Sequence, residues 1–197
     1  MHAHLRTGVA VLALALCVTV GVVTSPHAAA VVYNVVLNGA NEAPPNASPG
    51  TGTATVSIDA VAHTMYLHLD FAGTNGLTTA CHIHAATAVA GTGTAGVATT
   101  TPYFAGFPIN VNAGTYDNTL DMTLASSWNP GYITANGGTT ATAEAALFAA
   151  IAAGKAYLNV HTAAPLGVPG GEIRGFLLPA QVAVEATTWS KVKALYR

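Results

Sequence analysis

Three histidines and a cysteine are the residues of this sequence whose types and spacing suit metal binding. Cys81, His82 and His84 lie within four positions of one another in "TTACHIHAATAVAGTGTAGV", and His161 lies further along the chain in "GKAYLNVHT". On a β-strand, side chains at positions i and i+2 share one face about 7 Å apart, so His82 and His84 point the same way and Ile83 points the opposite way. This spacing can hold one metal ion.

His161 completes a set of three imidazoles if its strand lies beside the His-x-His strand. Three histidines from neighbouring strands suit copper or zinc, with a water molecule or a fourth side chain completing the coordination shell. His68, in "YLHLD", is the candidate for that fourth ligand. The alternative is that the three histidines hydrogen-bond to the backbone or to polar neighbours, among them Asn159 and Glu172, and join strands without any ion.

The N-terminal segment has the pattern of a secretory signal peptide. Arg6 precedes an uncharged run from Gly8 to Val23, which is followed by "TSPHAAA", a proline and small residues typical of a cleavage site. We expect residues 1–30 to be removed on export, which leaves the protein in the periplasm, on the cell surface or outside the cell without a stable membrane anchor. Cleavage would leave Cys81 without a disulfide partner, so it is either buried, bound to metal or reactive.

The amino-acid composition limits the kinds of partner that this protein can bind. Only 7% of the 197 residues are charged, and lysine and arginine form no cluster before the extreme C-terminus, so we expect no nucleic-acid partner. A partner protein or a second copy of the chain remains open. The basic, aromatic tail 180–197 is either a short attachment element or a frayed terminus.

Hydrophobic residues alternate along most of the chain, which predicts an antiparallel β-sandwich or barrel. Four segments show this period, namely "VVYNVVL", "GTATVSID", "TMYLHLDF" and "NTLDMTL", and "KAYLNVHT" and "GEIRGFLL" are expected to form a hairpin. One segment, "TAEAALFAAIAAG", has helical periodicity instead. It predicts a single short crossover helix with Thr142 as its N-cap and Gly154 as its end.

Four motifs in a fixed order resemble one known family. "LNGANEAPP", "CHIHAA", "AGKAYLNVHT" and "GGEIRGFL" together are similar to the CHRD domain, which is named after chordin and is widespread in exported bacterial proteins. The resemblance implies an immunoglobulin-like β-sandwich over residues 31–179 and a location outside the cytoplasm, but no settled biochemical activity. The chain departs from the family pattern at Cys81, where alanine is usual, and at Phe176, where glutamine is usual.

The remaining polar residues point to structure more than to catalysis. Glu172 and Arg174 share a strand face in "GEIRG", and with Asn159 they are expected to form a polar clasp between strands. No nucleophile elbow, phosphate loop or carboxylate pair is present, so enzymatic activity is not indicated. The His-x-His motif is similar to that of copper/zinc superoxide dismutase, but that family's further histidines, aspartate and disulfide are missing. Two functions stay open, a structural or protein-binding module and a copper- or zinc-binding protein.

Overall fold

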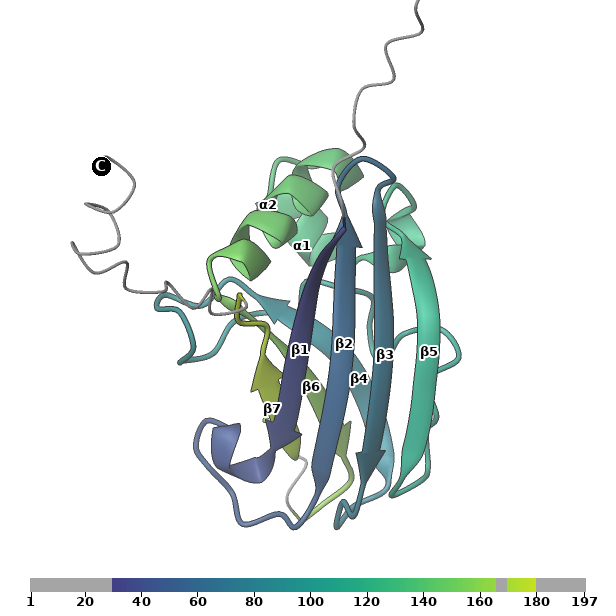
Figure 1. Ribbon diagram of the computed structural model, residues 1–197, viewed down its shortest axis with the longest axis vertical. Helices are drawn as coiled ribbons and strands as arrows, with labels where there is room; N and C mark the ends of the chain where they lie inside the picture. Colours follow the sequence, from purple (N-terminus) through teal and green to yellow (C-terminus); the bar gives the residue numbers. More distant parts are fainter. Residues whose placement is uncertain (1–29, 166–169, 180–197) are drawn as a thin grey trace, which may run out of the picture.

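The computed structural model describes residues 30–165 and 170–179 of the chain (Figure 1). The expected signal peptide, apart from its last residue, and the tail 180–197 lie outside the described residues. None of the helices in the described part combines the length and the apolar character that crossing a membrane would require.

Seven strands form one antiparallel sheet in the order β4-β6-β7-β1-β2-β3-β5. Their bounds are Val31–Asn38 (β1), Thr51–Asp59 (β2), Thr64–Ala72 (β3), Thr78–Ala85 (β4), Gly114–Asp121 (β5), Ala156–Thr162 (β6) and Ile173–Phe176 (β7). The sheet curls on itself, so that β1, β2, β3 and β5 lie in one layer and β4 and β6 cross behind them (Figure 1). The two layers meet where β7 pairs with β1 through Asn38 and Arg174. The predicted mainly β, sandwich-like fold is confirmed.

The buried side chains of the strands, which alternate with exposed ones in the first layer, fill the space between the layers. In β1, for example, Tyr33, Val35 and Leu37 are buried, whereas the residues between them are exposed. The opposite layer contributes Ile83 from β4 and Leu158 from β6, both fully buried. This period of two turns one face of β1, β2 and β3 toward a common core and the other face toward solvent.

Within residues 30–165 and 170–179, two α-helices, not one, lie at one end of the sandwich (Figure 1). The predicted helix is α2, Thr140–Ala152, and its N-cap is Thr139; Thr142, which we expected as the cap, is the third helical residue and completes a capping box. Gly154 follows the helix with φ of +66°, as predicted.

The unpredicted helix α1, Pro130–Ala135, begins in "NPG", a sequence typical of a turn. Proline fits the first position of a helix, where no N–H is needed. Two 3-10 turns, η1 (Gly39–Asn41) and η2 (Ala125–Ser127), complete the structure.

The second layer departs from simple alternation, because β4 and β6 are buried on both faces. β4 is an edge strand of the sheet, but the segment that follows it folds back along that edge. The backbone of Ile83 accepts a hydrogen bond from Ala98 at 2.8 Å, and Cys81 donates one to Pro102 at 3.2 Å. This segment covers polar side chains that would otherwise face solvent. The predicted β6–β7 hairpin pairing is confirmed.

Candidate metal centre

His82, His84 and His161 lie side by side on the β4–β6 strand pair. His82 is opposite Asn159 in the strand register, so His161, two residues further along β6, shares the face of His82 and His84. Ile83 points the other way, into the core, as the strand period predicts. The three histidines therefore face away from the hydrophobic core; His82 and His84 contact the segment that covers β4, and His161 is half-buried beside them.

The three rings are close enough to share one ion. Each offers a ring nitrogen, and these nitrogens all lie within 4.8 Å of one another. The ring centres of His82 and His84 are 4.7 Å apart, those of His82 and His161 are 4.7 Å apart, and those of His84 and His161 are 5.9 Å apart. No fourth histidine, cysteine or carboxylate from the described residues belongs to this group.

Backbone carbonyls fix the orientation of two of the rings. Nδ1 of His82 donates to the carbonyl of Pro102 at 3.0 Å, and Nδ1 of His84 donates to the carbonyl of Ala95 at 2.8 Å. A carbonyl oxygen only accepts, so Nδ1 carries the proton in both rings and Nε2 keeps its lone pair. Both rings thus have the tautomer that binds a metal through Nε2.

The Nε2 atoms of His82, His84 and His161 are all buried and have no hydrogen-bond partner. A buried polar atom without a partner costs about 1–3 kcal/mol, and such atoms are rare in native proteins. Here three of them belong to rings that lie together on one face of the β4–β6 pair. This is the arrangement expected of a ligand set for a cation.

Burial keeps the rings uncharged at neutral pH. It lowers the pKa of His82, lowers that of His84 to about 4, and lowers that of His161 to about 3. Charge repulsion among the rings adds to the effect for His84 and His161. Neutral imidazole is the form that coordinates metals, so the site does not have to lose protons before an ion enters at pH 7.

Tyr157 connects the histidines to Arg174. Its ring stacks on that of His84, and the guanidinium carbon of Arg174 lies 4.6 Å from the centre of the same ring. β6 lies between β4 and β7, so His84 and Arg174 approach opposite faces of Tyr157. Tyr157 was not predicted from the sequence as a residue of the site. Tyr157 lies directly opposite His84 where β4 pairs with β6, and this pairing is the signal that could have identified it.

Arg174 is buried and joins two loops. It donates through Nε to the carbonyl of Asn41 and through Nη1 to that of Gly93 at 3.0 Å, and it lies 3.7 Å from a carboxylate oxygen of Glu42. Burial raises the pKa of Glu42 to about 7 even though Arg174 opposes this shift. Asn159, the third residue expected in the clasp, donates to the carbonyl of Gly170 at 2.9 Å.

Glu172 binds two further loops. Its carboxylate accepts hydrogen bonds from the backbone N–H groups of Asn75 and Gly76 at 2.6 and 3.1 Å. It also accepts from the hydroxyl of Ser48 at 2.5 Å and from that of Thr162. Burial acts to raise the pKa of Glu172, but these hydrogen bonds outweigh it and hold the pKa below its ordinary value.

His68 does not join the three histidines. It lies on β3, in the other layer, where its two ring nitrogens are 2.9 Å from Asp117 and 3.1 Å from Asp70.

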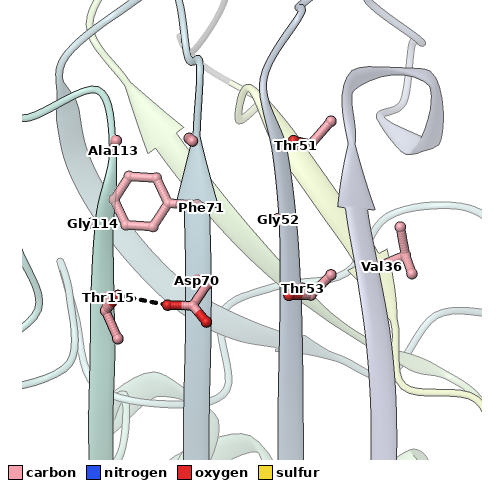
Figure 2. Close-up of a pocket in the computed structure, with 10 residues that line it drawn as sticks. Val36, Thr51, Gly52, Thr53, Asp70, Phe71, Ala113, Gly114 and Thr115 are labelled. Atoms are coloured by element: carbon pink, nitrogen blue, oxygen red, sulfur yellow. Dashed lines mark hydrogen bonds between the residues drawn. The ribbon is translucent and has the colours of Figure 1, made fainter.

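Asp70 also lines a depression of about 550 Å³ that extends across β1, β2, β3 and β5 (Figure 2). It accepts a hydrogen bond there from Thr115 at 2.5 Å. The polar groups of this region already bind one another.

Cys81 is also separate from the histidines. It precedes His82 on β4, so its side chain points to the core, where it is fully buried. Burial raises the pKa of its thiol far above the ordinary value. Of the alternatives open for this residue, the structure favours a buried core position.

Comparison with known proteins supports the resemblance found in the sequence. The family model of the CHRD domain matches residues 33–177 of this chain. The chain therefore belongs to the CHRD-domain family. No curated protein matches the chain, and no solved structure matches it. The family defines a β-sandwich module, and its function has to be argued from the residues of the site.

Proposed function

We propose that this protein binds a first-row transition metal ion, copper or zinc, through His82, His84 and His161. The observation that carries the proposal is the convergence of three buried Nε2 atoms, none of which has a hydrogen-bond partner. An ion at their centre would supply the missing partner to all three at once. The tautomers of His82 and His84 also support metal binding. In both rings Nδ1 donates to a backbone carbonyl, and hydrogen bonds of this kind orient metal-binding histidines in proteins.

The geometry requires a modest contraction of the site. Metal–nitrogen bonds of about 2.0–2.1 Å place three bound nitrogens about 3.4 Å apart, whereas the separations here extend up to 4.8 Å. A contraction of this size needs only small rotations of the rings about their side-chain bonds. The strand positions are already correct, since all three residues share one face of two paired strands.

The other candidate is a structural or protein-binding module in which the histidines serve only packing. The many contacts of Glu172 and Arg174 favour a rigid sandwich of this kind. This function leaves the three Nε2 atoms unexplained, and for that reason we favour metal binding.

Thermal unfolding with and without metal separates the two functions. A ligand that binds only the native state raises its stability, by about 2.7 kcal/mol at a concentration 100 times the dissociation constant. We expect copper or zinc to raise the melting temperature of the wild-type protein and to have no such effect on His161→Ala. Ile83→Val and His68→Ala are the matched controls and should keep the metal response. A wild-type melting temperature unchanged by every metal tested would contradict metal binding and favour the structural module.

We further propose that the protein acts outside the cytoplasm. The support is the N-terminal pattern of an Arg6-led apolar run followed by "SPHAAA". Mass spectrometry of the exported protein should find an N-terminus at or within a few residues of Val31. Recovery of the intact N-terminal segment in the membrane fraction would contradict this.

A further inference from the structure

We propose that the three-histidine site selects monovalent copper over divalent zinc and divalent copper. This inference rests on the proposed function, since it names the ion that the same three residues hold. Three features of the site support it: the absence of negative charge in the ligand set, the number of ligands, and the kind of group that orients the rings.

The ligand set carries no negative charge. It consists of neutral imidazoles, and no carboxylate or thiol of the described residues joins it. The carboxylate of Glu172, the residue that precedes β7, is directed to the loop amides of Asn75 and Gly76. Besides His82, the charged group that acts on His84 is the guanidinium of Arg174 on the far side of Tyr157, and it is positive. A bound ion would therefore keep its full charge.

Such a site favours an ion of low charge. The electrostatic cost of moving an ion from water into a buried site grows with the square of its charge, so a divalent ion has about four times the cost of a monovalent ion. Carboxylate or thiolate ligands offset this cost in many zinc sites, but they are missing here. The repulsion from Arg174, which the neighbouring carboxylate of Glu42 reduces, is also twice as large for a divalent ion.

The number of ligands points the same way. Zinc with three protein ligands keeps a fourth position for water, and divalent copper prefers four or more ligands. The three Nε2 atoms are shielded from solvent by the segment that covers β4. Monovalent copper is stable with three nitrogen ligands in a plane and needs no water molecule in the site.

The groups that orient the rings are carbonyls, not carboxylates. A carboxylate that accepts from the free N–H of a ligating histidine makes the ring a stronger donor to a divalent ion. Pro102 and Ala95 provide neutral acceptors instead. The rings are thus held in place with less added basicity than a carboxylate would give them.

Competition titrations of the purified full-length chain test the proposal. Monovalent copper, kept reduced by ascorbate without oxygen, is titrated against bicinchoninate, and zinc and divalent copper are titrated against chelators of known affinity. We expect monovalent copper to bind at least about 100-fold more tightly than either divalent ion. His84→Ala should lose at least about 100-fold in affinity for monovalent copper, whereas His68→Ala should match the wild-type protein.

A second variant tests the charge argument directly. Asn159 is paired with His82 across β4 and β6, and Asn159→Asp places a carboxylate next to the ligand set. The ratio of monovalent copper affinity to zinc affinity should fall by at least about tenfold in this variant. If it does not fold, the wild-type titrations alone decide.

The outcomes distinguish this proposal from the function on which it rests. Zinc or divalent copper binding as tightly as monovalent copper, with loss of binding in His84→Ala, would overturn the selectivity and leave the metal site standing. Failure of all three ions to bind the wild-type chain would overturn both.

Discussion

The imidazole ring of His84 stacks on the phenol ring of Tyr157, with ring centres 4.6 Å apart and planes 7° from parallel. The stack limits the rotation of His84, and the carbonyl of Ala95 fixes the same ring from its edge. Tyr157 is thus a positioning residue for the ligand set and does not itself contact the ion.

Replacing Tyr157 should weaken metal binding only where the new side chain lacks an aromatic ring that can stack on His84. Tyr157→Leu removes the stacking surface, and we expect metal affinity to fall by about 10-fold, within the range found for residues that orient metal ligands. Tyr157→Phe keeps the ring and should stay within about threefold of wild type. Chelator competition measures both affinities, and equal affinities in the two variants would show that the stack does not position His84.

The stability of the metal-free protein should fall as the pH drops below neutral. The pKa values of folded His84 and His161 are lowered to about 4 and about 3, whereas the unfolded chain binds protons below about pH 6.5. The unfolded state therefore holds more protons between these values, and each histidine costs up to about 1.4 kcal/mol per pH unit as the pH falls through this window.

Urea unfolding at several pH values in the presence of a chelator measures this dependence. His161→Leu removes one of the histidines with a lowered pKa and should flatten the curve between about pH 6 and pH 4. Other titrating groups, among them Glu42 and Glu172, are common to both proteins and cancel in the comparison. Identical slopes for the variant and the wild type would contradict the lowered pKa of His161.

Glu172→Gln should destabilise the fold strongly. The amide can accept through only one of its two end atoms, and its NH2 group would face either the Asn75 N–H and the Ser48 hydroxyl or the Gly76 N–H and the Thr162 hydroxyl. Since hydrogen bonds to a charged group contribute about 1.5–3 kcal/mol each, we expect a loss of at least about 2 kcal/mol by chemical denaturation. Asp117→Asn, which changes an exposed carboxylate, should cost less than about 1 kcal/mol. Equal losses in the two variants would mean that the clasp is unimportant.

Gly154→Ala should cost about 1 kcal/mol in the free energy of unfolding, because Gly154 ends α2 in a left-handed conformation that a Cβ disfavours. The added Cβ would also lie 3.2 Å from the side chain of Leu178. Gly96→Ala is the matched control, since an added Cβ there meets nothing within 4 Å and its φ is not in the left-handed range. A denaturation midpoint unchanged in Gly154→Ala would show that the strain is relieved elsewhere.

The layered β-fold and the face shared by His82 and His84 could be predicted because both follow from the period of two along a strand. The pairing of β4 with β6 could be stated only as a condition for the three-histidine set, since strand order depends on contacts far apart in the sequence. Helix α1 was missed because "NPG" suits a turn as well as a helix start. His68 was chosen as a fourth ligand from its residue type alone, and only the strand order separates it from His161.

The residues that prepare the site could not be predicted from their types. Ala95 and Pro102 act through backbone carbonyls, which every residue carries, so no sequence pattern marks them. The cover over β4 likewise arises from a segment rich in glycine, threonine and alanine that has no regular hydrophobic period.

The most direct test of the central claim is a crystal structure of the metal-loaded protein with diffraction data collected at the absorption edge of the metal. We predict a single anomalous peak about 2 Å from the Nε2 atoms of His82, His84 and His161, and its loss in crystals of His161→Ala. A peak at any other site, or no peak in crystals grown with excess metal, would contradict the assignment of these three histidines as a metal centre.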